Sequence, residues 1–347
     1  MDKDEVSSSQ EFITVNPIET LEGDDDSTSI SLQLVKRLKD ARYHSLESVV
    51  VLGAQQISND IRVGLDSSQR ICGLASMKLI DSARTKSANQ IPPIFHIETG
   101  SKTLDHYLGG GIEVGAVTEF FGKSASGKTQ LCHTISVTSQ VSPRLVYSLR
   151  NIDDGKCSKV IYIDTEGAFY PHRIYQIARA RGLKSENIVE NIIPINCYSV
   201  LEQEQYLKYI CELLDTYRSI SLIIVDSIIS HFRTEYPGRS VLPERQQRLN
   251  KYLSTLSRIA RIYKVAVVIT NQMQSIPSGY NEDNSSGGNI LSHNSTHRVR
   301  LNKSGFGNVY ATIIKSPYHA SNVPDAKFII TNKGIDDLDL ELGHIVR

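Results

Sequence analysis

The fold is decided by the stretch Gly122-Lys123-Ser124-Ala125-Ser126-Gly127-Lys128-Thr129. It fits the pattern G-x-x-x-x-G-K-[ST], which is typical of a phosphate-binding P-loop. A strand-like run, 116–121, precedes it, and a helix-like run, 130–135, follows it. The motif needs this strand–loop–helix context, so the sequence favours a true P-loop over a chance glycine-rich turn before a helix.

The residue types of this loop suit a nucleoside triphosphate. The glycines let successive backbone N–H groups point at an anion, and the helix that starts near Gly127 adds its positive end. Lys128 is expected to reach the β- and γ-phosphates, and the Thr129 hydroxyl to bind Mg²⁺. We therefore expect residues 122–129 and the following Gln130 to bind ATP together with Mg²⁺.

Composition limits the class of protein. The chain has 347 residues, 40% of them hydrophobic, which is enough for a large domain with a real core and a small one. No apolar run approaches the ~18 residues of a membrane span, so no membrane association is expected. The five cysteines are odd in number and form no C-x-x-C pair, which favours reduced thiols.

The net charge of zero conceals a split along the chain. Residues 1–26 hold nine acids and one base, which leaves eight more bases than acids in the rest. We expect residues 1–29 to be an acidic disordered tail. A basic body is compatible with nucleic-acid binding but does not establish it.

Three further segments follow the tail. Residues 30–87 have the apolar spacing of short helices, with Gly64 and Gly73 expected in the turns. This unit is either a helix-hairpin-helix-like module that grips phosphates or a plain packing domain. Residues 88–96 contain a Pro-Pro pair and are expected to be a linker, so that residues 97–347 form the second domain.

The second domain alternates apolar strands with amphipathic helices. Strand-like runs occur at 117–121, 160–165, 192–195, 222–226 and 265–270. Nearly continuous apolar strands separated by helices predict an α/β fold with a mainly parallel sheet covered on both faces. Shorter strands are expected at 298–301, 309–314 and 328–331.

Polar side chains follow three of these strands. Asp226 ends one strand and fits an acid that binds Mg²⁺. Glu166 follows the second and is a candidate general base for the water that attacks the γ-phosphate. Gln272 follows the third and would sense the γ-phosphate. Because parallel sheets bind ligands at the carboxyl ends of their strands, these residues are expected to lie near the P-loop.

Two polar loops follow the last two of these strands in the chain. The loop 233–245 combines Arg233, Arg239 and Arg245 with an aromatic and turn residues, which is typical of a loop that follows a phosphate backbone. The second loop, 273–292, is rich in Ser, Asn and Gly and contains Gly287-Gly288-Asn289. Long loops at the ligand end of a rigid sheet are commonly functional.

Together these residues resemble the RecA-like strand-exchange recombinases, most closely the RadA and eukaryotic branch. The resemblance covers roughly residues 97–335. It is carried by segments 99–105 and 109–113, the P-loop helix 127–134, Ser230-His231-Phe232-Arg233, the run 244–251, and Gly287-Gly288-Asn289 followed by His293 and Ser295-Thr296.

The resemblance implies a RecA-like P-loop NTPase core that assembles on DNA and hydrolyses ATP. It implies that Glu166 is the catalytic carboxylate and that Arg173 stacks on adenine. Arg233, Arg239 and Arg245 would lie in or beside the first DNA loop, and Gly287, Gly288 and Asn289 in the second. The family's N-terminal helical domain corresponds loosely to residues 30–87.

The sequence also departs from the family pattern. Lys123 and Ser124 stand where Glu and an aromatic residue are usual in the P-loop, and the chain has no Phe-x-x-Ala motif to dock one subunit on the next. Lys315 stands where this branch usually has Asp. Two interpretations of Lys315 are open: it caps the ATP of a neighbouring subunit in place of a monovalent cation, or it is an exposed lysine without such a role.

The sequence therefore predicts a DNA-dependent ATPase that binds single-stranded DNA and pairs it with a homologous duplex in recombination and repair. Lys128, Glu166 and Gln272 are the expected catalytic residues, and Thr129 and Asp226 the expected metal ligands. The partners would be single- and double-stranded DNA and either copies of this chain or a related recombinase. The alternative is a paralogue that binds ATP and a true recombinase but exchanges no strands. The expected location is nuclear in a eukaryote and cytoplasmic otherwise.

Overall fold

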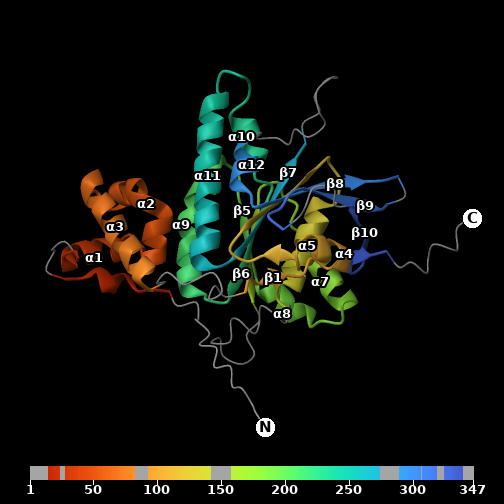
Figure 1. Ribbon diagram of the computed structural model, residues 1–347, viewed down its shortest axis with the longest axis horizontal. Coiled ribbons are helices and arrows are strands. Elements are labelled where there is room, and N and C mark those ends of the chain that lie inside the picture. Colours follow the sequence, from red (N-terminus) through yellow and green to blue (C-terminus); the bar gives the residue numbers. More distant parts are fainter. Residues whose placement is uncertain are drawn as a thin grey trace, which may run out of the picture.

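The computed structural model describes residues 15–23, 28–82, 93–141, 158–273, 289–305, 307–318 and 324–338. In this part of the chain a nine-stranded sheet lies between two layers of helices, and a separate group of helices packs beside one layer (Figure 1). None of the described helices is both long and apolar enough to cross a lipid bilayer.

The large sheet is mainly parallel. Its strands are, in spatial order, β11 (Gly334–Asp337), β10 (Ala326–Thr331), β9 (Val309–Lys315), β8 (His297–Lys303), β3 (Val117–Gly122), β7 (Ala266–Gln272), β6 (Ile220–Asp226), β4 (Lys159–Asp164) and β5 (Ile192–Asn196). The strands from β8 to β5 are parallel, whereas β9, β10 and β11 continue the sheet in antiparallel fashion. The predicted α/β class with a mainly parallel, helix-covered sheet is confirmed.

Alternation along the buried strands builds two cores. In β6, Leu222 and Ile224 pack on one face, and Ile223 and Val225 pack on the other. The first face is covered by α4 (Lys102–Tyr107), α5 (Lys128–Thr138), α7 (Pro171–Ala180) and α8 (Ser185–Glu190). The second is covered by α9 (Val200–Thr216), α10 (Ser230–Glu235), α11 (Leu242–Tyr263) and α12 (Asn289–Asn294). A small antiparallel pair, β1 (His96–Ile97) and β2 (Ile112–Glu113), precedes the P-loop strand.

The N-terminal helical unit contains a short 3-10 helix η1 (Ile18–Leu21), α1 (Leu32–Asp40), α2 (Leu46–Ile61) and α3 (Leu65–Ser82). Ile18 and Leu21 are fully buried in its core, so packing in this unit begins before the expected residue 30. Residues 1–14 and 24–27, most of the expected acidic tail, lie outside the described residues.

The expectation of a turn at Gly73 was wrong. Gly73 lies inside α3, whereas Gly64 directly precedes it as expected. A helix-interior glycine costs roughly 0.5–1 kcal/mol relative to alanine. Burial of its neighbours Ile71, Leu74 and Ala75 in the helical core offsets that cost.

The helical unit packs on α9 and α11 (Figure 1). A polar junction of side chains joins it to these helices. The Ser45 hydroxyl, at the N-cap of α2, donates to Oδ1 of Asp215 at 2.6 Å, and the Tyr263 hydroxyl donates to the same oxygen at 2.9 Å. Beside this junction Lys208 forms an ion pair with Asp60 at 2.6 Å. Burial raises the pKa of Asp215 to about 6, so its charged form is disfavoured in the packed state.

This junction predicts a dependence of stability on pH. The carboxyl of Asp215 binds a proton more tightly in the folded chain than in the unfolded one. Its contribution to stability is therefore full below about pH 4 and is lost as the pH rises through about 6. Asp215→Asn removes this titration, so the melting temperature of the variant relative to wild type should rise between pH 4 and pH 7. The exposed Asp325→Asn serves as the control, and equal pH profiles for all three proteins would contradict the prediction.

Among the described residues, the sheet ends at β5, in an edge that contains a proline. Asn191 and Cys197 direct backbone hydrogen bonds to β4. By the alternation of a parallel ladder, the intervening Ile192, Pro194 and Asn196 direct their backbone groups to the open side. Pro194 thus removes a donor from the free edge and none from the ladder, which is where a strand tolerates proline.

Candidate active site

The candidate active site lies where four neighbouring strands end. β3, β7, β6 and β4 are adjacent in the sheet, and their carboxyl ends carry the P-loop, Gln272, Asp226 and the turn with Glu166. Parallel pairing places all four ends at one edge of the sheet. Residues that are far apart in the chain are thereby brought into direct contact.

The P-loop connects β3 to α5, and two glycines shape it. Gly127, the N-cap of α5, has a φ of 99°, which favours glycine. At Gly122 a Cβ atom would lie 2.4 Å from the carbonyl oxygen of Leu301, so no larger residue fits. The Lys128 ammonium donates to the carbonyl oxygens of Gly122 at 3.1 Å and Lys123 at 2.9 Å. Burial lowers the pKa of Lys128, and the charges of Asp226 and Glu166 oppose that shift.

Asp226 is a buried carboxylate with three hydroxyl donors. Thr129 Oγ1 donates to its Oδ2 at 2.8 Å, Tyr162 donates to the same oxygen at 2.9 Å, and Thr270 donates to Oδ1 at 2.5 Å. Burial and the adjacent carboxylate raise the pKa of Tyr162, which keeps it a neutral donor. Mg²⁺ is usually bound through one or two carboxylates together with substrate phosphates. The donor set of Asp226 and Thr129 fits that chemistry.

Glu166 is linked to both the strand end of β7 and the first loop. Its Oε1 accepts hydrogen bonds from the Ser227 hydroxyl at 2.6 Å and from Nε2 of Gln272 at 3.0 Å. The other amide atom of Gln272, Oε1, accepts from Arg233 at 3.4 Å. A continuous path therefore runs from an arginine of the first loop through Gln272 to Glu166.

The turn that carries Glu166 is held by Asp164, the last residue of β4. Its carboxylate accepts backbone N–H groups of Glu166 at 3.1 Å, Ala168 at 3.1 Å and Phe169 at 2.9 Å. Three charge-assisted bonds to one carboxylate restrict the backbone of this turn. Glu166 itself is exposed, so its side chain faces the open end of the sheet.

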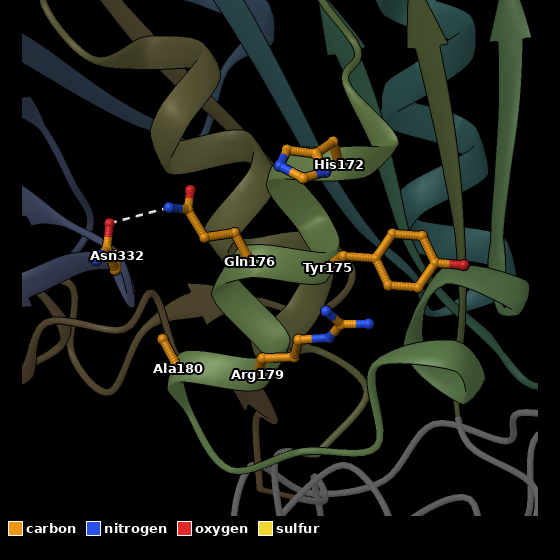
Figure 2. A pocket seen from close by; sticks show the side chains of 6 residues that line it. All are labelled: His172, Tyr175, Gln176, Arg179, Ala180 and Asn332. Carbon is orange, nitrogen blue, oxygen red and sulfur yellow. Dashed lines mark hydrogen bonds between the residues drawn. The ribbon is translucent and has the colours of Figure 1, made fainter.

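Arg173 lies beside a pocket on the outer side of α7. Its guanidinium donates to the side-chain oxygens of Gln130 at 2.8 Å and Gln176 at 2.5 Å, and to the carbonyl oxygen of Thr331 at 2.6 Å. The pocket has a volume of about 570 Å³ and is lined by His172, Tyr175, Gln176, Arg179, Ala180 and Asn332. Figure 2 shows that the amide of Gln176 points toward Asn332, in the turn after β10, to which it donates a hydrogen bond at 3.0 Å.

The three arginines of the first loop differ in their surroundings. Arg233, in α10, and Arg239 are exposed. Arg245 lies in the first turn of α11 rather than in the expected loop; it is half-buried and donates to the carbonyl oxygen of Tyr236 at 3.5 Å. The ring of Tyr236 lies under the guanidinium of Arg248, at 5.2 Å. In the second loop, Gly287 and Gly288 lie outside the described residues, and Asn289 begins α12.

Lys315 ends β9 and contacts the end of α12. Its ammonium donates to the carbonyl oxygens of Ser292 and Ser295, both at 2.7 Å. Desolvation and the nearby Arg298 lower its pKa. From the sequence, Lys315 was expected either to cap the ATP of a neighbouring subunit or to be exposed without such a role. Neither expectation included hydrogen bonds to carbonyl oxygens of its own chain.

The P-loop lies beside Asp226 and Glu166, at the carboxyl ends of neighbouring parallel strands in the order β3-β7-β6-β4. This arrangement defines an α/β core of the RecA-like P-loop class. A family model described as Rad51 matches residues 91–338. The chain therefore belongs to the Rad51 family of RecA-like recombinases, and the resemblance found in the sequence is confirmed. At the level of the family, membership implies an ATPase that binds DNA, oligomerises and acts in recombination.

Sequence patterns did not identify several residues that hold the site. Tyr162 and Thr270 donate to Asp226, and Ser227 donates to Glu166. Tyr162 lies within an apolar strand, where a tyrosine fits as an ordinary core residue. Thr270 lies within the last three residues of β7, and Ser227 directly follows β6; these positions near the carboxyl ends of parallel strands were the signal that could have indicated them.

Proposed function

We propose that this chain is a DNA-dependent ATPase that binds single-stranded DNA and promotes its pairing with a homologous duplex. The observation that carries the proposal is the path from Arg233 through Gln272 to Glu166, next to the P-loop. It provides direct contacts through which DNA on the first loop would alter the candidate base. The test is ATP hydrolysis and strand exchange by the purified protein, with and without single-stranded DNA.

The residues at the strand ends have distinct proposed roles. Lys128 would bind the β- and γ-phosphates, and Asp226 and Thr129 would hold Mg²⁺, which supplies charge neutralisation when bound. Glu166 would accept a proton from the attacking water. Gln272 would contact the γ-phosphate and change partners when the phosphate leaves.

The pocket beside Arg173 is the proposed site of the adenine base. Arg173 would stack on the ring, and the amides of Gln176 and Asn332 offer both donors and acceptors to its edge.

Arg233 and Arg239 are expected to contact DNA phosphates. Replacing either with Ala should weaken binding of single-stranded DNA with little dependence on its sequence. The slope of log K against log salt should fall by roughly 0.7 for each DNA phosphate that the variant no longer neutralises. Binding is measured by fluorescence anisotropy over a series of salt concentrations.

The control for these variants is Arg218→Ala. Arg218 is also exposed, but it precedes β6, at the opposite end of the strand from the first loop. Its replacement should leave the salt slope unchanged. If Arg233→Ala and Arg239→Ala also keep the wild-type slope, these arginines serve packing or ion pairs instead.

A second candidate function is favoured by one feature of the sequence. The chain contains no Phe-x-x-Ala motif, and that motif docks neighbouring subunits in the recombinases that this sequence resembles. The alternative is thus a paralogue that binds ATP and assists another recombinase. Strand exchange by this protein alone supports the first function, whereas stimulation of a partner recombinase without exchange of its own supports the second.

The role of Lys315 predicts the cation dependence of hydrolysis. Its ammonium already donates hydrogen bonds to two carbonyl oxygens and supplies a positive charge there, so DNA-stimulated ATPase should be nearly indifferent to replacing potassium with sodium. Lys315→Asp would set a carboxylate beside the same carbonyl oxygens, which together form a site for a monovalent cation. That variant should require potassium, as measured by ATPase assays at equal ionic strength.

The control variant is Lys303→Asp, which reverses an exposed charge at the end of β8. It should hydrolyse ATP at the same rate in both salts. Strong potassium dependence of the wild type, or a salt-indifferent Lys315→Asp variant, would refute the prediction.

A further inference from the structure

A buried ion pair in the middle of the sheet joins β3, the strand that carries the P-loop, to the neighbouring strand β8. Glu119 on β3 is fully buried, and its Oε2 accepts a hydrogen bond from Nε of Arg298 on β8 at 2.5 Å. The guanidinium of Arg298 also lies over the ring of Phe121, at 5.0 Å. Because burying two charges commonly costs as much as their attraction returns, the pair is weak evidence for a gain in stability. Its hydrogen bonds do restrict the orientation of the side chains that Glu119 contacts.

The neighbour that Glu119 orients is Asn271. Nδ2 of Asn271 donates to Oε1 of Glu119 at 2.9 Å, so the two carboxylate oxygens have separate partners. The amide oxygen of Asn271 accepts the backbone N–H of Gln272 at 2.8 Å. Asn271 is fully buried, and its side chain therefore fixes the backbone of the residue that contacts Glu166 and Arg233.

The carboxylate of Glu119 contacts the two strands that flank the second loop, β7 and β8. The chain leaves the sheet after Gln272 and returns through α12 to β8, which carries Arg298. In the sheet, Glu119 pairs in register with Ile269 of β7 and with Arg298 of β8. Asn271 ties the departing strand to Glu119, and Arg298 ties the returning strand to it.

We propose that Asn271, held by the buried Glu119, is a positioning residue for Gln272. It fixes the backbone of Gln272, whose side-chain amide contacts Glu166. Because Glu119 contacts both Asn271 and Arg298, it also connects the position of Gln272 to β8, the strand that follows the second loop. The inference rests on the proposed function, because it assigns Asn271 to ATP hydrolysis without any contact with the nucleotide.

The test compares Asn271→Ala, Gln272→Ala and the double variant with wild type in steady-state ATPase assays at saturating single-stranded DNA. Asn271→Ala should lower the DNA-stimulated kcat by roughly tenfold or more, since a misplacement of about 1 Å can cost 10²-fold. The KM for ATP should stay within about twofold of the wild-type value, because no binding group is removed. The double variant should be no slower than Gln272→Ala, since the two residues act through one contact.

The matched control is Thr118→Val. Thr118 is the buried neighbour of Glu119 on β3, and among the described residues its hydroxyl has no hydrogen-bond partner. This variant should keep the wild-type kcat. A wild-type kcat for Asn271→Ala, or losses that add fully in the double variant, would overturn the inference. A wild-type protein without DNA-stimulated hydrolysis would instead overturn the proposed function, and this inference with it.

A second measurement does not depend on activity. Hydrogen exchange of the full chain reports on the backbone N–H of Gln272, which Asn271 protects. Peptides that cover the end of β7 should exchange faster in Asn271→Ala than in wild type or Thr118→Val. Unchanged exchange in Asn271→Ala would show that Asn271 does not fix this backbone.

Discussion

Glu166→Gln is expected to lose ATP hydrolysis by a factor of about 10²–10⁴, the usual contribution of a general base, while nucleotide binding is kept. Glutamine has the size of glutamate and can still accept the hydrogen bond that Ser227 donates to Oε1. The turn that carries residue 166 should also stay in place, because the carboxylate of Asp164 holds its backbone. What the variant lacks is a group that can take a proton from water. Single-turnover hydrolysis and binding of a fluorescent ATP analogue measure the two effects separately.

Glu190→Gln provides a matched control, because Glu190 is exposed at the end of α8, away from the P-loop. It should hydrolyse ATP at the wild-type rate. If Glu166→Gln retains hydrolysis within about threefold of wild type, far short of the range for a general base, another group activates the water.

Lys128→Ala is expected to weaken ATP binding or turnover at least tenfold. Its ammonium donates to backbone carbonyl oxygens inside the P-loop, where a triphosphate would bring negative charge. A charged hydrogen bond contributes about 1.5–3 kcal/mol, and the loop's backbone dipoles offset the phosphate charge only in part. Isothermal titration with ATP and steady-state hydrolysis measure the loss.

The corresponding control is Lys102→Ala, which removes an exposed lysine from α4. It should bind ATP as wild type does, and a thermal melt should show that both variants are folded. Wild-type hydrolysis by Lys128→Ala would contradict the P-loop interpretation of residues 122–129.

The parts of the fold that depend on local patterns could be predicted from the sequence. The P-loop is recognised from the spacing of its own residues and from the strand-like and helix-like runs that flank it, and the buried strands show as continuous apolar runs. The strands expected at 298–301 and 309–314 lie within β8 and β9. The short strands β1, β2 and β11, of two to four residues, have too few residues for a detectable alternation.

Contacts between distant segments could not be predicted in this way. Glu119 and Arg298 are 179 residues apart, so no spacing rule indicates that they meet. Lys315 was assigned to a neighbouring subunit or to solvent because its partners are backbone carbonyl oxygens, which carry no signal in the sequence. Asp226 was recognisable as a strand-end acid, but its three hydroxyl donors come from three other elements.

The proline in β5 affects how this protein behaves when many copies are crowded together. Suppose that an extended segment of another chain aligns with β5. Of the three outward-facing residues of β5, the second is Pro194, which has no N–H group to donate. The new pairing would lack the backbone hydrogen bond at position 194, which makes it less stable. Pro194→Val would restore that donor and turn the end of the sheet into a template for β-aggregation. We therefore expect Pro194 to disfavour pairing of this edge with strands of other copies.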